Sequence, residues 1–513
     1  MMPKKQGSWC APNWLRAWLH PRVTTMFFFG FSAGLPLLLI FSTLSVWLRE
    51  AGVERSAVTF FSWAALGYSF KFIWAPIIDR LPVPLLNSVF GRRRSWLLLA
   101  QLSVIVAMIG MGLVDPAAGN SLLWMALAAV LLGFSSATQD IVVDAYRIEC
   151  VEESMQALLA STYVAGYRVG MLVAGAGSLY LASWLGTSRE FYDYQAWRVT
   201  YLIMAGLMGV GVLTTLMVSE PVVNRAREEV QSLSDSLRFL TLFVLMAATF
   251  GLTFFLSANL FQSLKLSVVQ GGALVGFVVE TGRFLLALLA ALSVAHLATW
   301  VGLAERVMVS RTYVAPVRDF FDRYGLKTAL LILLLVGFYR ISDIVLGVVS
   351  NVFYLDMGFS KNVIATVTKT FGLAMTLLGG FLGGMLTVRY GVNRILFVGG
   401  ILAAATNLLF MLLASVGPDL TLLTVVIAAD NLCAGLASIA FIAFLSSLTN
   451  ISFTAVQYAL FSSLMTLFPK LIGGYSGTVV SSWGYESFFL MTAIMGLPVL
   501  VLIWLLRKVD KRS

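Results

Sequence analysis

The chain has 513 residues, of which 59% are hydrophobic and only 12% are charged, and its formal net charge is +10. Soluble domains carry about 25% charged residues, so this composition excludes a water-exposed globular protein and favours lipid-facing helices. The three cysteines, Cys10, Cys150 and Cys433, lie too far apart for a metal-type spacing or a disulfide framework. His20 and His296 are the only histidines, which excludes a histidine-rich metal site. We therefore expect no cofactor, and we attribute the positive charge to loop topology and not to nucleic-acid binding.

The first 22 residues are basic and contain no apolar core that ends at a small-residue cleavage site, so we interpret them as a retained cytoplasmic segment. Because a helix needs about 20 apolar residues to cross a membrane, the sequence predicts fourteen spans. Six lie near 23–47, 56–78, 95–114, 121–143, 157–184 and 199–218. Two follow near 239–263 and 282–303. The last six lie near 327–348, 361–385, 394–415, 421–447, 453–480 and 486–506.

These spans predict an all-α membrane protein with a defined order of segments. We expect, in chain order, a cytoplasmic segment (1–22), a six-helix bundle (23–219), a linker (220–238), two inserted helices (239–303), a second linker (304–326), a second six-helix bundle (327–506) and a cytoplasmic tail (507–513). An even number of spans places both termini on one side. With the termini inside, the inner loops hold 23 Lys and Arg residues and the outer loops hold 7. This bias predicts cytoplasmic termini.

The two six-helix sets resemble each other. Residues 51–55 (AGVER) link the first two spans, and residues 357–361 (MGFSK) occupy the same place in the second set. The fifth span of each set carries a glutamine and then a cation, Gln156 with Arg168 and Gln457 with Lys470. Chance similarity among glycine-rich helices is the alternative. Two parallel bundles joined by a cytoplasmic linker resemble the organisation of major facilitator transporters.

The loop after the second span resembles the signature of that superfamily, G-x-x-x-D-[RK]-x-G-[RK]-[RK]. It departs from the signature because Ala75 replaces the first glycine and ten residues separate Arg80 from Gly91. A positive-inside loop is the alternative interpretation. If the loop latches the cytoplasmic side, the gating residues are Asp79, Arg80, Arg92 and Arg93, with Asp144 and Arg147 as partners at the end of the fourth span.

Ionisable residues within spans are functional candidates, because each costs several kcal/mol in lipid unless it is paired or hydrated. The cations are Lys71, Arg168, Arg340, Lys369 and Lys470, and the anions are Asp140, Asp343 and Asp430. The excess of cations predicts a site for a substrate that bears carboxylate or phosphate groups. Two alternatives remain open: Arg340 and Asp343 can form a local salt bridge at i, i+3, and Lys71 can extend to the membrane surface.

Proton coupling, if present, must depend on carboxylates, because neither histidine lies in a suitable span. A buried carboxyl can bind a proton because desolvation disfavours its charged form, and a nearby cation opposes this effect. The candidates are Asp140, Asp343 and Asp430.

Several strings are similar to the AmpG family of muropeptide permeases. They are 136–145 (SATQDIVVDA), 166–173 (GYRVGMLV), 70–76 (FKFIWAP), 90–94 (FGRRR), 315–321 (APVRDFF) and 430–435 (DNLCAG). The resemblance covers about 23–220 and 310–506. It implies proton-driven import of anhydro-muropeptides, which are disaccharide–peptide fragments of the cell wall, across the bacterial inner membrane. It also implies a part in wall recycling and in β-lactamase induction.

The residue chemistry agrees with such a substrate. Stem peptides carry several carboxylates, which the substrate-binding cations Arg168, Lys369, Arg340 and Lys470 can hold. Sugar rings stack on aromatic side chains, and Tyr167 and Tyr339 each lie beside a cation. We expect the carrier to act as a monomer in the lipid bilayer, with protons as its coupling ion.

Two other functions remain open. A carrier of the same fold can transport another organic anion, such as an acyl-CoA or a sugar phosphate, because fold alone does not select a substrate. A membrane enzyme acting on lipid-linked sugars would need converging acids or a metal site. We interpret Glu149, Glu152 and Glu153 as a solvated loop, and we therefore expect a transporter and not an enzyme.

Overall fold

The structure is a computed structural model of the whole chain. It describes residues 20–40, 42–53, 68, 71–118, 121–152, 155–188, 191–221, 233–258, 260–261, 263, 272–302, 310–360, 363–473 and 476–510, with some side chains inside these ranges left undescribed. Every regular element within these ranges is helical, which confirms the all-α fold.

The N-terminal set of elements comprises α2 (Pro21–Ile40), α3 (Ser42–Glu50), η2 (Lys71–Ile73), α6 (Ala75–Arg80), α7 (Leu86–Phe90), α8 (Arg92–Gly112), α9 (Ser121–Cys150), α10 (Gln156–Leu172), η4 (Val173–Gly177), α11 (Ser178–Trp184), α12 (Tyr194–Leu207) and α13 (Gly209–Met217). The middle set comprises α14 (Leu233–Leu256), α16 (Gly272–Trp300) and η5 (Ser310–Val314). The C-terminal set comprises α18 (Ala315–Phe338), α19 (Ile341–Asp356), η6 (Ile364–Phe371), α21 (Gly372–Tyr390), α22 (Val392–Val416), α23 (Leu420–Ser447), η7 (Ile451–Phe453), α24 (Thr454–Gly473), α25 (Ser476–Met495) and α26 (Leu497–Asp510).

Within the described residues, ten helices are long and apolar enough to cross a membrane. Two shorter apolar helices, Thr241–Leu256 and Leu285–Trp300, lie in the middle set. The expected second span, 56–78, falls mostly outside the described residues. The number of fourteen spans therefore stays a prediction.

The chain forms two compact units. The first comprises Met1–Ile78, Pro82–Val223 and Gly325–Ser513, and thus contains the described helices of both the N-terminal and the C-terminal set, apart from the start of α18 and the end of α6. The second comprises Asp79–Leu81 and Asn224–Tyr324. In the second unit, the Arg283 guanidinium of α16 donates from Nε to the Phe254 carbonyl at 2.8 Å and lies 3.9 Å from the centre of the Phe254 ring. Arg283 is buried, and its contact with Phe254 holds α14 against α16.

The two halves of helix α9 differ in their exposure. Its first half exposes an apolar stripe with helical spacing, formed by Trp124, Leu127, Leu131 and Phe134. Lipid can cover such a stripe at no cost. From Ser135 to Ile148 every residue is buried, although several are polar or charged. The second half of α9 is therefore surrounded by protein, and its polar side chains need partners there.

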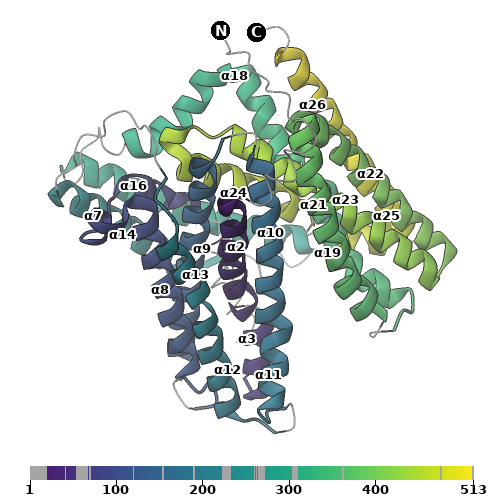
Figure 1. The fold of residues 1–513 in the computed structure, drawn as a ribbon, viewed down its shortest axis with the longest axis horizontal. Helices are drawn as coiled ribbons and strands as arrows, with labels where there is room; N and C mark the ends of the chain where they lie inside the picture. Colours follow the sequence, from purple (N-terminus) through teal and green to yellow (C-terminus); the bar gives the residue numbers. More distant parts are fainter. Residues whose placement is uncertain are drawn as a thin grey trace. The chain divides into compact units, whose positions relative to one another are not determined.

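Helices α2 and α10 are in contact through glycine on both sides. A Cβ atom at Gly30 would lie 2.0 Å from the Tyr163 carbonyl oxygen, and one at Gly166 would lie 1.9 Å from the Phe27 carbonyl oxygen. Small residues spaced by four positions let membrane helices approach closely, as at a G-x-x-x-G pair. Helix α2 consequently lies between α9 and α10 (Figure 1), and α10 is held in one position against it.

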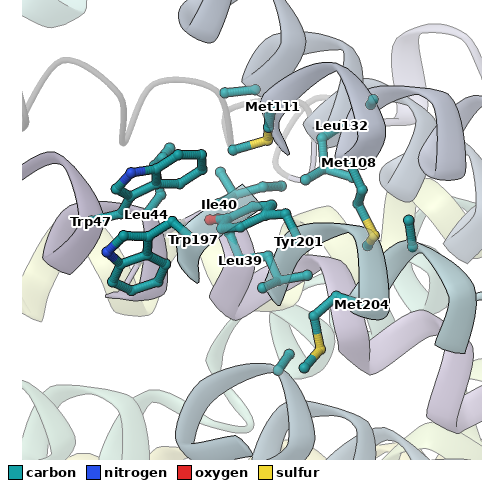
Figure 2. Close-up of a cluster of buried hydrophobic side chains, with 14 of the residues drawn as sticks. Leu39, Ile40, Leu44, Trp47, Met108, Met111, Leu132, Trp197, Tyr201 and Met204 are labelled. Carbon is teal, nitrogen blue, oxygen red and sulfur yellow. The ribbon is translucent and has the colours of Figure 1, made fainter. Parts of the chain in front are cut away.

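An aromatic cluster packs in the N-terminal half at the end opposite the start of α2. The rings of Trp47 and Trp197 stack with 5.6 Å between centroids, and Tyr201 packs on Trp47 at 4.8 Å. Methionine and leucine side chains from α2, α8, α9 and α12 surround these rings (Figure 2). The cluster binds the first, third, fourth and sixth spans into one bundle.

The two halves meet at the end where α9 finishes and α10 begins. The Ser161 hydroxyl donates to the Gly380 carbonyl at 2.9 Å, which joins α10 to α21. Four buried residues of α10 and α23 form a shared apolar cluster: Ala157, Ala160, Ile439 and Ala443. The first two turns of α10 therefore pack against the C-terminal half, and the following turns carry the candidate site.

Candidate functional site

Arg147 is the residue on which the contact between the halves is centred. Its guanidinium is fully buried, and its Nη1 atom donates to Ser446 Oγ in α23 at 2.9 Å. It also lies 5.1 Å from the ring centre of Tyr458 in α24. Within its own half, Nη1 donates to Gln156 Oε1 at 3.3 Å and Nη2 pairs with Asp144 at 3.4 Å. One charged side chain thus connects α9 with two helices of the opposite half.

Asp144 lies between two cations. Its Oδ2 atom is 3.6 Å from Lys71 Nζ, and its Oδ1 atom faces Arg147. Lys71 is itself buried, so it does not extend to the membrane surface. A buried ion pair of this kind costs several kcal/mol to break by removal of one partner, because the other charge stays uncompensated. Asp144 therefore holds Lys71 and Arg147 in a fixed arrangement.

Asp140 lies one turn before Asp144 on the same face of α9. Its carboxyl interacts electrostatically with Lys71, Asp144 and the Tyr163 hydroxyl. Its Oδ1 atom is buried and has no hydrogen-bond partner within the described part of the chain. Asp140 and Asp144 thus both interact with Lys71. A change in the charge of Asp140 therefore alters the electrostatic interactions among all three residues.

Three tyrosines, Tyr68, Tyr163 and Tyr167, interact with Asp140. Tyr163 and Tyr167 lie one turn apart on α10 with their ring centres 6.1 Å from each other. Tyr68 makes a hydrogen bond with Ser136 on α9, and its phenol interacts electrostatically with Asp140, as does that of Tyr167. Three phenol groups thus lie near the Asp140 carboxyl.

Two further predicted cations, Arg168 and Arg340, come from opposite halves. Arg168 is on α10 and is exposed, whereas Arg340 lies in the turn between α18 and α19 and is half-buried. Their guanidiniums interact electrostatically. Asp343 also interacts electrostatically with Arg340, but the described residues include no ion pair between them. The structure therefore does not form the local salt bridge that the i, i+3 spacing allowed.

The other predicted acid, Asp430, lies on α23. It accepts a hydrogen bond from Thr406 Oγ1 at 3.3 Å and interacts electrostatically with Asp343. The side chains of Lys369 and Lys470 lie outside the described residues. Their roles in substrate binding stay predictions.

Tyr339 is part of the packing of the C-terminal half. Its hydroxyl donates to the Leu396 carbonyl at 3.0 Å, and its ring stacks on Phe441 at 4.4 Å. The side chain is buried, so both its polar and its apolar surfaces are occupied by protein. We therefore leave Tyr339 out of the proposed site.

The charged residues of the signature loop differ in burial. Asp79 is buried, whereas Arg80 and Arg92 are half-buried. The Arg93 guanidinium is buried and binds the Glu149 carboxylate through two donors at 3.0 and 2.5 Å. Glu149 lies in α9 with its side chain only 1% exposed, so our interpretation of it as part of a solvated loop was wrong. It is instead the counter-ion that holds α8 to α9, and latching by this loop stays a prediction.

Sequence reasoning missed four residues that complete the site: Tyr163, Gln156, Ser446 and Tyr458. The spacing of Tyr163 with Tyr167 on one helical face was an available signal. A sequence signal was also available for Gln156, because Gln457 occupies the matching place in the second half. Gln156 donates to the Arg147 and Ile148 carbonyls, and Gln457 accepts a hydrogen bond from the Asn450 amide at 2.7 Å. Ser446 and Tyr458 gave no signal, because serine and tyrosine are ordinary residues of membrane helices. Among the described residues, no cluster of three or more metal-ligating side chains occurs.

Comparison with known proteins identifies the family. The sequence profile of the Major Facilitator Superfamily matches residues 23–314 and 322–513. The anhydromuropeptide permease of Escherichia coli K12 is 31% identical over 498 residues, which cover 97% of this chain and 82% of that protein. AmpG 4 of Rickettsia conorii, which carries the name of a transporter, is 31% identical over 490 residues, or 95% of this chain and 97% of that protein.

Solved structures agree with this fold. The proton:xylose symporter XylE, bound to 6-bromo-6-deoxy-D-glucose, has a TM-score of 0.57 at 12% identity, with 96% of each chain covered. A variant of the Escherichia coli fucose:proton symporter FucP has a TM-score of 0.59 at 11% identity, with 96% of this chain and 99% of that chain covered. The chain therefore belongs to the AmpG family of the major facilitator superfamily, and it is a multi-pass membrane transporter and not an enzyme.

Proposed function

We propose that this transporter imports anhydro-muropeptides, composed of N-acetylglucosamine, anhydro-N-acetylmuramic acid and a short peptide, from the periplasm to the cytoplasm, driven by protons. The observation that carries the proposal is the 31% identity with the anhydromuropeptide permease across 97% of this chain. Uptake of these fragments would serve cell-wall recycling. The excess of basic residues in the predicted inner loops supports an inner-membrane protein with both termini in the cytoplasm.

In this orientation the Arg147 contact closes the cytoplasmic side. Helices α9 and α10 meet the opposite half at the end that faces the cytoplasm, through Arg147 and through Ser161. A carrier with this side closed receives substrate from the periplasm. Import then requires Arg147 to release Ser446 and Tyr458, so that the halves can separate.

Asp140 is suited to link a proton to this step. When Asp140 is ionised, the two carboxylates of α9 balance Lys71 and Arg147. When it is protonated, Lys71 interacts with Asp144 alone and competes there with Arg147. Protonation thereby weakens the hold of Asp144 on Arg147 and favours opening toward the cytoplasm. Asp343 and Asp430 supply further carboxylates for protons in the C-terminal half.

The test is uptake of labelled anhydro-muropeptide by the purified monomeric carrier in proteoliposomes. We expect accumulation when the lumen is less acidic than the medium, and only equilibration when a protonophore is added. Liposomes without protein provide the control. Accumulation that ignores the proton gradient would contradict coupling. If muropeptide is not taken up at all but a labelled acyl-CoA or sugar phosphate is, another organic anion is the substrate.

A further inference from the structure

Gln156 binds Arg147 through both ends of its side-chain amide. It is the first residue of α10, and its side chain is buried. Its Oε1 atom accepts a hydrogen bond from Arg147 Nη1 at 3.3 Å. Its Nε2 atom donates to the Arg147 carbonyl at 3.2 Å and to the Ile148 carbonyl at 3.1 Å. One amide therefore holds the guanidinium and the stretch of α9 backbone that carries it.

Asp144 and Gln156 together fix the direction of the guanidinium within the N-terminal half. Asp144 accepts from Nη2 at 3.4 Å, and Gln156 accepts from Nη1. A guanidinium is planar, so two held nitrogens determine where its other donors point. Each Nη atom carries two hydrogens, and the second donor of Nη1 reaches Ser446 Oγ at 2.9 Å. The direction of the donor that joins the halves is thus set by residues of one half alone.

The opposite half accepts this donor with its own bonds intact. The Ser446 hydroxyl donates to the Ile442 carbonyl of its own helix at 2.8 Å, so its oxygen is available to accept from Arg147. The ring of Tyr458 lies 5.1 Å from the guanidinium, within the range of a cation–π contact. How readily the contact forms therefore depends on the direction in which Arg147 is held.

The second half provides an internal comparison. Gln457 matches Gln156 in the repeat, and it accepts a hydrogen bond from the Asn450 amide at 2.7 Å, which holds the turn before α24. Arg147 precedes Gln156 by nine residues, and the residue nine positions before Gln457 is Leu448. Both glutamines therefore bind backbone near the start of their helix. Binding of an arginine is a further role that Gln156 has in the first half.

We propose that Gln156 is a positioning residue of the cytoplasmic contact, which holds Arg147 in the direction of the opposite half before the halves meet and thereby favours closure. The proposal rests on the proposed function, in which this contact closes the cytoplasmic side, and it adds the residue that regulates closure. Immobilising a flexible side chain at an interface weakens association by about two- to tenfold. Because Gln156 and Asp144 already restrain Arg147, closure avoids most of this loss.

The test measures how often the contact opens when the carrier is held in lipid nanodiscs. The native cysteines are replaced by serine, and Ala443→Cys serves as the reporter, since Ala443 is 1% exposed within the apolar cluster shared by the halves. A water-soluble maleimide reaches this cysteine when the halves separate, so the rate of labelling follows the open fraction. We expect Gln156→Met, which keeps the length of the side chain without its hydrogen bonds, to raise the rate by about two- to tenfold. Gln457→Met, the matched control, should leave the rate unchanged.

Gln156→Glu separates the positioning of Arg147 from the binding of the α9 backbone. A carboxylate still accepts from the guanidinium but no longer donates to the two carbonyls. We therefore expect Gln156→Glu to lower the melting temperature as Gln156→Met does, yet to keep the labelling rate close to that of the wild type. If both variants raise the rate equally, Gln156 acts through the end of α9 alone and the proposal is overturned. Gln156→Asn, whose amide is too short to span both partners, replaces Gln156→Met if that variant does not fold.

The outcomes separate this inference from the proposed function. If Gln156→Met is labelled at the wild-type rate, or if Gln457→Met accelerates labelling equally, the positioning role is wrong and the function stands. If the reporter in the presence of Gln156 reacts as fast as a cysteine at Val89, which is 71% exposed, the contact does not close the cytoplasmic side. The inference and that part of the proposed function are then both rejected. If the labelling rates are as expected but the wild type takes up no muropeptide, the substrate is wrong and the role of Gln156 stands.

Discussion

Trp197 donates a hydrogen bond from Nε1 to Glu50 Oε2 at 2.8 Å, which joins the start of the sixth span to the end of the first. Tyr485 makes the corresponding bond to Asp356 in the second half. An aromatic residue three positions before each acid packs on the donor's ring, Trp47 in one half and Phe353 in the other. The same arrangement of acid and aromatic residues thus occurs at the same place in both halves.

The chain turn after each acid is also the same. Gly52 and Gly358 adopt φ values of +82° and +88°, which favour glycine, and each ends its helix. The amide of Val53 bonds back to Leu48 and that of Phe359 to Tyr354, in the six-to-one pattern of a Schellman motif. The matching motifs and contacts explain why residues 51–55 and 357–361 looked related in the sequence.

The Trp197 bond predicts a stability change. Trp197→Phe should lower the free energy of unfolding by about 1 kcal/mol or more, because Glu50 loses a donor in a partly buried position. Thermal unfolding in detergent measures the effect. Trp184→Phe is the matched control, since Trp184 is 82% exposed. Equal midpoints for the two variants would contradict a structural role for the bond.

The α2–α10 contact predicts that glycine is required there. Gly166→Ala would place a Cβ atom 1.9 Å from the Phe27 carbonyl oxygen, so the helices must move apart. We expect a loss of about 1–3 kcal/mol of stability or no folded protein, since backbone cannot yield as a flexible side chain can. Gly206→Ala, with no atom within 4 Å of its Cβ, should be neutral or stabilising. The yield and melting temperature of the two variants decide the matter.

The cytoplasmic contact predicts that holding the halves together stops transport. Val164 and Val388 pack against the same apolar cluster from α10 and α21. The test variant has its native cysteines replaced by serine and carries Val164→Cys and Val388→Cys. Joining these two cysteines with a short bifunctional maleimide should abolish muropeptide uptake. A pair within one half, Ile105→Cys with Ala128→Cys, should keep uptake after the same treatment. Full uptake by the first cross-linked pair would show that this contact need not open.

Proton coupling predicts a specific defect in Asp140→Asn. We expect gradient-driven accumulation to be lost, because an asparagine side chain cannot take up and release a proton. Exchange of internal for external substrate should persist, because it needs no net proton movement. Asp322→Asn, at a residue whose side chain is 70% exposed, is the control. If Asp140→Asn accumulates substrate as the wild type does, another carboxylate carries the proton.

Charged residues are rare in membrane helices, so the sequence could identify candidates by their charge, and their roles stay predictions. Asp140, Asp144 and Arg147 were identifiable because ionised groups in apolar helices need partners. Their spacing on α9 also placed them on related faces. The partner of Arg147 in the other half was not identifiable, since Ser446 lies 299 residues away in the chain. A polar contact of that separation depends on how two bundles dock.

Because burial could not be inferred from local composition, Glu149 was interpreted wrongly and the position of Lys71 was left open. Glu149 lies beside other acids and resembles a solvated loop residue, yet the end of α9 buries it against Arg93. Lys71 has a stem long enough to reach the membrane surface, but Asp144 holds it inside. Each side chain had two energetically reasonable positions, and the neighbouring helix determined which one is occupied.

The sequence by itself determined that the chain is a bundle of membrane helices in two related halves, with more cations than anions among the charged residues of the spans. The physical reason is the cost of placing polar groups in lipid, which governs the length of apolar segments, the charge of the loops and the rarity of ions within spans. Only the tertiary structure decided that Arg147 joins the halves through Ser446 and Tyr458. The reason is that the strength of an interaction between charges depends on their distance in space, which is set by the packing of helices far apart in the chain.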